Sequence, residues 1–290
     1  MKQTKKIMKV LRSKPTIEGA GVRLRRAFGY YEVPLLDPFL MLDHFGSDNP
    51  ADYLAGFPWH PHRGIETVTY MIRGTVEHGD SMGNKGVIAS GDVQWMTAGS
   101  GIIHQEMPKR YEGQSMGFQL WVNLPASRKM MEPRYREVKK DEISEVPLAK
   151  GVHVKVVAGQ LNGVKGPVRD LVVDCEYFDV SLDPRATFEH PVRQGYKAFA
   201  YVFEGSGHFD GDSGKLVDME HLVVYHQDGD HVKVTSGDAK VGFILALGKP
   251  LGEPVAWRGP IVMNTEEELD LAFEEYSNGT FIKSGGKRKR

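Results

Sequence analysis

Two short histidine motifs are the part of this sequence best suited to chemistry. His60 and His62 form a His-x-His motif, and His104 and Glu106 form a His-x-Glu motif. Residues two apart on a β-strand point to the same face, and Pro61 favours an extended backbone in the first motif. On neighbouring strands the two motifs would place three imidazoles and one carboxylate around one point. Buried polar groups of this kind need a compensating partner, so the spacing predicts that these four side chains hold a metal.

The donor atoms narrow the metal only to a class. Nitrogen and oxygen ligands without a thiolate suit Fe(II), Mn(II), Co(II), Ni(II), Cu(II) or Zn(II), and they disfavour copper(I), four-cysteine zinc and iron–sulfur sites. Four protein ligands on a six-coordinate metal leave positions for water, O2 or a chelating substrate, which would make the site catalytic. A closed tetrahedral zinc would instead be structural. The residues alone leave both alternatives open.

The elements expected to position these motifs are short strands. Glycine and proline separate runs rich in Val, Ile, Tyr, Phe and Thr, a pattern typical of strands joined by turns. Strands are predicted at residues 67–72, 118–122, 152–157, 198–203 and 241–247. One helix is expected near the C-terminus, where Thr265 can cap an acidic first turn and apolar residues recur at helical spacing as far as Tyr276. An all-β fold with a short C-terminal helix follows.

The two halves of the chain resemble each other in the order of their segments. Residues 67–78 match 198–209, and residues 118–125 match 243–250. This order predicts two tandem β-domains of similar topology, although two all-β segments can also share such features by chance. The charged stretch 134–145 is the expected boundary region, which gives domains at residues 1–135 and 136–290.

Composition and charge exclude several classes of protein. The 290 residues include 37 Lys+Arg and 38 Asp+Glu, and this near-neutral balance argues against a direct nucleic-acid partner. The single cysteine, Cys175, cannot form an intramolecular disulfide, so a cytoplasmic protein is expected. No apolar run is long enough for a membrane span, and no signal peptide is expected at the N-terminus. The absence of a Gly-rich phosphate loop argues against nucleotide-dependent chemistry.

Two stretches of the sequence carry a family resemblance. Residues 56–68 (GFPWHPHRGIETV) and 91–108 (GDVQWMTAGSGIIHQEMP) resemble the two signature stretches of the pirin family of bicupins. Three further stretches are similar to that family: residues 36–43, 119–125 and 259–265. The resemblance implies two tandem cupin domains, each a jelly roll or double-stranded β-helix. It also implies that an iron-type metal, Fe(II) above all, lies in the N-terminal domain on the two histidine motifs.

The sequence departs from the general cupin pattern at several positions. Glu66 sits where general cupins place a metal-ligating glutamate, but in pirins the acidic ligand comes from the second motif, so Glu66 is expected to have a supporting role. Thr97 stands where a proline is usual. Pro191 and Arg193 stand where the second domain would carry its His-x-His motif. The C-terminal domain is therefore expected to lack the metal site.

The resemblance implies a metal-dependent dioxygenase of the quercetinase type, which cleaves quercetin or a related flavonol with O2 and releases carbon monoxide. Glu106 would then also act as a catalytic base that accepts the flavonol hydroxyl proton. The alternative is an iron-dependent binding protein that acts on a transcription factor or a metabolic enzyme without turnover. A third possibility is a cupin with a purely structural metal.

The expected partners are a small aromatic, flavonol-like substrate and O2. A protein partner remains an alternative, no membrane partner is expected, and the chain is expected to be a monomer. Four aromatic side chains either line an apolar substrate cleft or pack in the barrel core: Phe57, Trp59, Trp95 and Trp121.

Overall fold

The computed structural model describes residues 2–211 and 215–283, and the chain forms two compact units. The first unit comprises residues 15–34, 39–140 and 251–290, and the second comprises residues 1–14, 35–38 and 141–250. The main change from first to second unit, between residues 140 and 141, falls inside the charged stretch 134–145. Both units nevertheless take segments from the opposite end of the chain, whereas the sequence analysis expects contiguous domains. The division after residue 135 stays a prediction.

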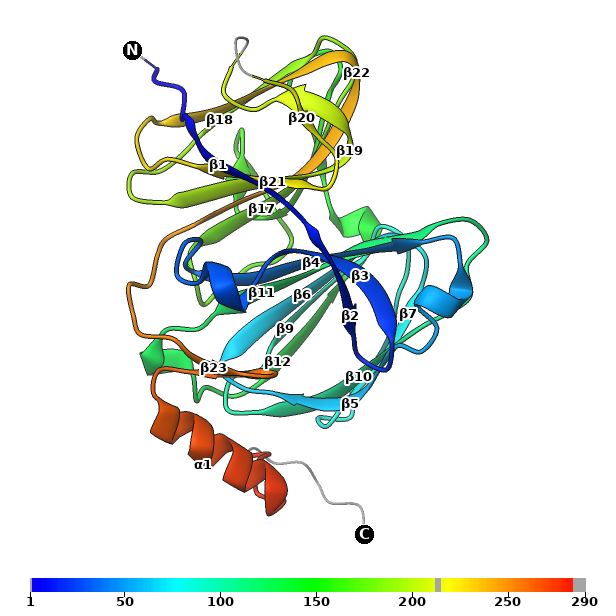
Figure 1. The fold of residues 1–290 in the computed structure, drawn as a ribbon, viewed down its shortest axis with the longest axis vertical. Coiled ribbons are helices and arrows are strands. Elements are labelled where there is room, and N and C mark those ends of the chain that lie inside the picture. The colour runs from blue at the N-terminus through cyan, green and yellow to red at the C-terminus, as the bar shows by residue number, and fades with distance from the viewer. Residues whose placement is uncertain (1, 212–214, 284–290) are drawn as a thin grey trace. The chain divides into compact units, whose positions relative to one another are not determined.

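The first unit is built on two β-sheets (Figure 1). The larger sheet has the strand order β12-β9-β6-β11-β4-β3-β2, and the smaller has the order β5-β10-β7-β8. The larger sheet consists of β2 Lys14–Glu18, β3 Val22–Phe28, β4 Phe39–Ser47, β6 Ile65–Arg73, β9 Val93–Thr97, β11 Ser115–Asn123 and β12 Arg134–Val138. The smaller consists of β5 Phe57–His62, β7 Val76–Asp80, β8 Lys85–Ile88 and β10 Ile102–Pro108.

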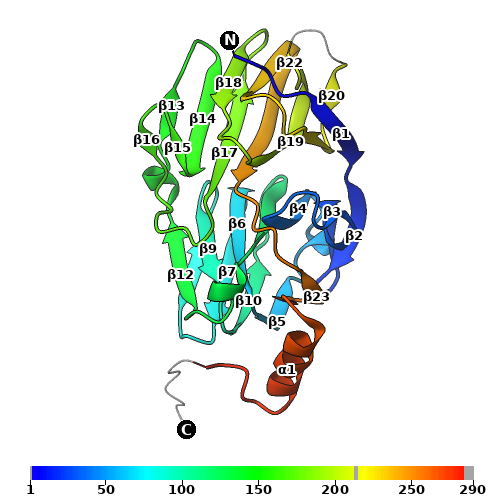
Figure 2. The ribbon, with the colours of Figure 1, turned by 90° about the vertical axis from the view of Figure 1, so that its left-hand side faces the viewer.

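The C-terminal segment completes the first unit. It contains the β23 (Ala256–Arg258) and β24 (Ile261–Met263) hairpin and then helix α1 (Glu266–Ser277). Thr265 caps the helix as predicted: its side chain accepts from the backbone N–H of Glu268, whose side chain accepts from the Thr265 N–H in return. Leu269 and Ala272 of α1 are buried in a cluster with residues of the hairpin. In Figure 2 the hairpin strand β23 lies beside β5, which carries the first histidine motif.

The second unit is built on one nine-stranded sheet with the path β1-β21-β19-β22-β17-β14-β13, to which β18 and β20 add by pairing with β22 and β19. Its strands are β1 Ile7–Arg12, β13 Glu145–Pro147, β14 Val152–Ala158, β17 Cys175–Leu182, β18 Thr187–Pro191, β19 Lys197–His208, β20 Val217–Asp218, β21 His221–Tyr225 and β22 His231–Gly248, with a separate pair β15 Gln160–Leu161 and β16 Val164–Lys165. A large buried apolar cluster lies in its interior.

The all-β prediction is confirmed, and each predicted strand lies within an observed one. The main difference is β22, which begins ten residues before the predicted start at residue 241 because polar residues such as Ser236 and Asp238 obscure its first half. The first half of β22 pairs with β18 and with the end of β19, and the second half pairs with β17 and with the rest of β19. This single strand therefore makes the pairings that β10 and β11 divide between them in the first unit.

Short 3-10 helices lie between strands of the described chain: η1 Tyr30–Glu32, η2 Pro50–Asp52, η3 Ala126–Arg128 and η4 Lys140–Glu142. Within the described part of the chain, no helix has the length and apolar character needed to cross a membrane.

Candidate metal centre and cavity

Strands β5 and β10 bring the two histidine motifs together in the first unit. The strands are antiparallel, and His104 lies opposite His60 while Ile102 lies opposite His62. The ligand atoms of His60, His62 and His104 lie within 4.8 Å of one another. The ring centroids of His60 and His104 are 4.3 Å apart. The predicted convergence of the three imidazoles is therefore present.

Backbone carbonyls orient the two imidazoles of the first motif. The Nδ1 of His60 donates to the carbonyl of Pro58 at 2.8 Å, and the Nδ1 of His62 donates to the carbonyl of Pro260 at 3.0 Å. Because a carbonyl oxygen only accepts, each ring holds its proton on Nδ1 and has its lone pair on Nε2. The two Nε2 atoms face each other at 3.1 Å. Two opposed lone pairs at this distance call for a cation between them.

Burial keeps the imidazoles of His62 and His104 neutral and available as ligands. Burial above all, and then the neighbouring His60, lowers the pKa of His62 to about 3, although the hydrogen bond to Pro260 opposes the shift. Burial and the adjacent imidazoles also hold the pKa of His104 well below its usual value. Neither ring nitrogen of His104 has a hydrogen-bond partner among the described residues. Such orphaned buried nitrogens fit a site made for a metal.

Glu106 lies beside this cluster, on the side of His78. A bulge between His104 and Glu106 shifts the register, so that Glu106 lies opposite Phe57 on β5 and opposite His78 on β7. Its ligand oxygen groups with His78 and His104, again within 4.8 Å, rather than with all three imidazoles. The structure therefore brings Glu106 close to His104, as predicted, and adds His78, which the sequence analysis missed.

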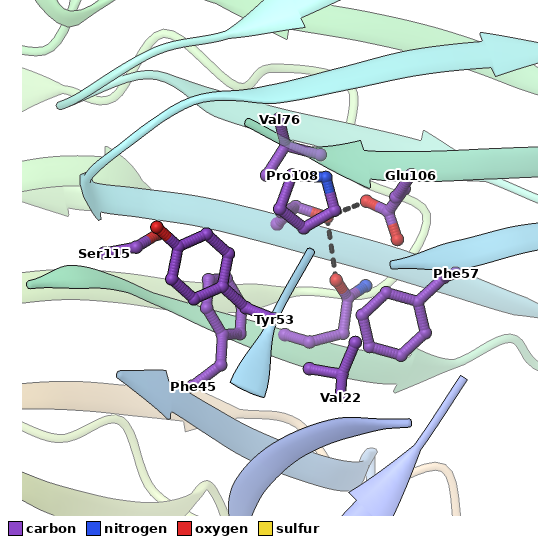
Figure 3. Close-up of a pocket in the computed structure, with 10 residues that line it drawn as sticks. Val22, Phe45, Tyr53, Phe57, Val76, Glu106, Pro108 and Ser115 are labelled. Carbon is purple, nitrogen blue, oxygen red and sulfur yellow. Dashed lines mark hydrogen bonds between the residues drawn. The ribbon is translucent and has the colours of Figure 1, made fainter. Parts of the chain in front are cut away.

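A hydrogen-bonded relay holds the Glu106 carboxylate. Thr69 Oγ1 lies 2.8 Å from Glu106 Oε1 and 2.8 Å from the side-chain amide of Gln119. Glu106 Oε1 and Gln119 Oε1 both face the hydroxyl, which has one proton to donate. Donation of that proton to the Glu106 carboxylate requires the Gln119 amide to be turned over, so that its nitrogen donates to Thr69 Oγ1. The relay lies beside a small pocket of about 20 Å³, bordered by Phe45, Phe57 and other mostly apolar side chains. Figure 3 shows Glu106 among the residues that line this pocket, with the hydrogen bonds of the relay as dashed lines.

Glu66 takes no part in either histidine grouping. It is buried on β6 and accepts a 2.6 Å hydrogen bond from Thr97 Oγ1. Burial raises the pKa of Glu66 against the effects of this hydrogen bond and of Arg134. The expected supporting role stays a prediction, and the Thr97 hydroxyl that replaces the usual proline is the group that binds Glu66.

A large cavity of about 820 Å³ opens onto the candidate metal centre. His60, His62 and Glu106 lie on its wall. Phe57, Trp59 and Trp121 line this cavity, which agrees with a position in a cleft. Trp95 is instead buried in the core, at 1% exposure.

Sequence analysis missed two further aromatic residues of the cavity wall. Trp257 lies 5.7 Å from Trp121 and 5.7 Å from Tyr30 between ring centroids, and Trp121 lies 5.1 Å from His62. The rings thus form a continuous wall that leads from His62 towards the exposed Tyr30.

A charged cluster forms a polar part of the same cavity wall. Arg26 makes a two-pronged ion pair with Asp43, at 2.8 and 2.7 Å, and a 2.9 Å ion pair with Glu18. Burial raises the pKa of Asp43, although Arg26 opposes this shift. The cluster offers both donors and acceptors to a polar ligand. No motif pointed to it, because its members come from three different strands.

The second unit has one phenylalanine and one histidine on the strand where a comparable centre would need two histidine ligands. His190 and Phe188 on β18 face Val232 and Val234 on β22, in the pairing that corresponds to β5 and β10. Phe188 and Phe243 are buried and in ring contact. Within residues 2–211 and 215–283, the groupings of His, Cys, Asp and Glu that could hold a cation lie in the first unit.

Comparison with known proteins decides the family. The Pirin family profile matches residues 21–122, and the profile for the Pirin C-terminal cupin domain matches residues 177–282. A pirin-like protein of Caulobacter vibrioides is 46% identical over 95% of this chain and 98% of its own length. The chain belongs to the pirin family. Its two domains are therefore cupins, as the resemblance implied.

Other pirins and a solved structure extend this comparison. Human pirin is 41% identical over 96% of this chain and 94% of its own length. The crystal structure of a quercetin 2,3-dioxygenase from Acinetobacter baumannii matches with a TM-score of 0.89 and 30% identity, covering 96% of this chain and 98% of that one. This chain thus combines a pirin fold with a His/Glu cluster able to bind a metal.

Proposed function

We propose that this pirin is a metal-dependent dioxygenase of the quercetinase type, which cleaves quercetin or a related flavonol with O2 and releases carbon monoxide. The observation that carries the proposal is the cavity of about 820 Å³ that joins His60, His62 and Glu106 to a wall of aromatic rings. Such a cavity has the size and apolar lining typical of small-molecule sites. The similarity to a solved quercetin 2,3-dioxygenase supports the choice of substrate.

In this proposal His60, His62, His104 and Glu106 hold one divalent transition metal, with Fe(II) as the first choice. The opposed Nε2 atoms of the first motif and the orphaned nitrogens of His104 support this donor set. Nitrogen and oxygen donors also fit Mn, Co, Ni, Cu or Zn. When bound, the metal would supply Lewis acidity towards the flavonol oxygens and redox chemistry towards O2.

The chain's own residues would orient the flavonol and move its proton. Trp121, Trp257 and Phe57 would hold the flat rings by stacking and exclude water from the centre. The Arg26–Asp43–Glu18 cluster would hydrogen-bond to hydroxyl groups elsewhere on the flavonol. Because Thr69 holds Oε1 of Glu106, Oε2 is the atom that would accept the proton of the flavonol hydroxyl.

Turnover of quercetin tests this proposal. The protein is reconstituted with Fe(II) without air, and oxygen uptake and quercetin absorbance are then followed. We expect turnover in the native chain, at least about 100-fold slower turnover in Glu106→Gln as for loss of a catalytic base, and loss of turnover in the His60→Ala, His62→Ala double variant.

The same experiment separates the enzyme from the alternative. Full turnover in Glu106→Gln would remove the base role of Glu106. Tight metal binding without turnover, for Fe(II) and for the other candidate metals, would favour an iron-dependent binding protein that acts on a protein partner. A cytoplasmic location and a monomeric state remain proposals, with the single cysteine as support for the former.

A further inference from the structure

His78 lies beside the proposed metal ligands without a role in the proposed reaction. It stands on β7 opposite Glu106 of β10, and its neighbour Asp80 stands opposite His104. The His78 side chain has 0% exposure, and its Nδ1 has no hydrogen-bond partner among the residues that the structure describes. A buried nitrogen without a partner is costly, so packing alone does not account for a histidine here.

Asp80 determines which nitrogen of His78 is free. Asp80 Oδ2 lies 3.5 Å from His78 Nε2, and the Asp80 carboxylate accepts hydrogen bonds from Asn84 and from the Met82 N–H at 2.8 to 3.0 Å. Because the carboxylate accepts, His78 holds its proton on Nε2 and has its lone pair on Nδ1. Metal-ligating histidines typically donate their other N–H to a carboxylate or carbonyl in this way.

Three donor groups converge on this side of the centre. His78, His104 and Glu106 each offer one ligand atom, these atoms lie within 4.8 Å of one another, and all three residues are buried. This grouping shares His104 with the three-histidine grouping, and it shares both His104 and Glu106 with the four-ligand centre proposed above. His104 can serve either position, because neither of its ring nitrogens has a hydrogen-bond partner in the described chain that would fix which one carries the proton.

A second cavity reaches this grouping at His78. It has a volume of about 490 Å³ and is lined by His78 and Asp80, whereas Glu106 lies on the wall of the larger cavity with His60 and His62; Trp59 borders both cavities. The charged residues on its wall are Glu77, Asp80 and Lys85, with Glu77 in a 2.7 Å ion pair with Lys109. The buried carboxylate of Asp80 makes the inner end of this approach favourable for a cation.

We propose that His78, His104 and Glu106 form a second position for a divalent cation, adjacent to the three-histidine position. One ion occupies one position at a time, since two divalent cations that share His104 would repel each other. The second position receives the ion from the cavity beside β7 and β8 and passes it to His60 and His62. The proposal rests on the proposed metal centre but requires no turnover.

Cobalt binding to a set of variants tests the second position. The His60→Ala, His62→Ala double variant keeps His78, His104 and Glu106. We expect it to bind one equivalent of Co(II), at least about 10-fold more weakly than the native chain, with visible d–d absorption bands of its own. Addition of His78→Phe, which keeps an aromatic ring against Tyr135, should weaken this residual binding at least about 10-fold further.

Two controls keep the test decisive. His44→Phe, added to the same double variant, replaces another buried histidine and should leave residual Co(II) binding unchanged. Asp80→Asn keeps the His78 ring and replaces only the carboxylate behind it, so it should weaken residual binding even where His78→Phe fails to fold. The proposal is overturned if the double variant binds no Co(II). It is also overturned if neither the change at His78 nor the change at Asp80 weakens the residual Co(II) binding. Because the readout is cobalt binding, absent quercetin turnover bears only on the proposed function.

Discussion

At the scale of single residues, the candidate centre depends on groups that fix the protonation and direction of each donor. Backbone carbonyls fix His60 and His62, and Thr69 fixes Glu106. None of these partners is itself a predicted ligand. Outer groups of this kind commonly change metal affinity about 10- to 100-fold when they are lost.

Thr69→Val should therefore lower the affinity for Co(II) or Fe(II) about 10-fold, because it removes the hydroxyl that holds Glu106 Oε1 while it keeps the shape of the side chain. Thr69→Ser retains the hydroxyl and should restore most of the affinity. Competition against a chromophoric chelator measures both. Equal affinities for the valine and serine variants would show that the relay does not position Glu106.

The burial of His44 predicts how the stability of the folded chain depends on pH. Burial, and to a smaller extent Arg25, lowers the pKa of His44 to about 4 in the folded chain. The unfolded chain takes up this proton near the ordinary pKa of 6.5, so the folded state loses stability as the pH falls from about 6.5 to about 4. The full difference amounts to about 3 kcal/mol.

The His44→Phe variant should consequently lose less stability than the native chain over this pH window. Urea unfolding at a series of pH values measures the free energy of unfolding, and the comparison with the native chain cancels the contributions of the other histidines. Above pH 7, plots of the free energy of unfolding against pH should run parallel for the variant and the native chain. The same slope in both proteins below pH 6.5 would contradict the assigned burial of a neutral imidazole.

At the scale of elements, the C-terminal segment is part of the candidate centre. Pro260, between β23 and β24, accepts the hydrogen bond that orients His62, although the two residues are 198 positions apart. Arg63 ties the same region together through hydrogen bonds to the carbonyls of Ser100 and Phe281. The buried ammonium of Lys129 donates to the carbonyls of Gly64 and Val262.

Gly64 allows the backbone of β24 to lie close to the end of β5, because it has no side chain. Its φ is +78°, and a Cβ added there would lie 1.9 Å from the Val262 carbonyl oxygen. Gly64→Ala should displace β24 and its Pro260 anchor, with a loss of more than about 2 kcal/mol in stability and about 10-fold in metal affinity.

Gly83→Ala is the matched control, since Gly83 also has a positive φ, of +93°, but has open space around it. Gly83→Ala should lose stability through backbone strain but should keep the metal affinity of the native chain. Thermal unfolding and Co(II) titration report the two effects. An unchanged metal affinity in Gly64→Ala would mean that the C-terminal segment does not support His62.

The elements also show why sequence analysis found part of the site. His60, His62, His104 and Glu106 share a spacing that β-strands convert directly into proximity. His78 and Asp80 have the same spacing, but their position opposite Glu106 and His104 depends on the pairing of β7 with β10, which no local pattern reveals. Trp257 and Pro260 reach the cavity only through tertiary packing.

At the scale of the whole molecule, the two units share the cupin fold but differ in the side chains that face the interior. The first unit places histidines on β5 and β10, whereas the second places Phe188 and a His190 that is bonded to Glu176 at 2.6 Å on the corresponding β18. The all-β class follows from patterning that both units share. The ability to bind a metal does not follow from that patterning, because it depends on a few inward-facing side chains.

The location of a bound metal tests the central claim most directly. Crystals of the Fe(II)-loaded protein, measured at wavelengths on both sides of the iron absorption edge, give an anomalous difference map for the whole chain. We predict one strong peak in the first unit, between the Nε2 atoms of His60 and His62 and within bonding distance of His104 and Glu106. A principal peak beside His190 and Glu176, or no peak in a protein that retains iron in solution, would contradict the account.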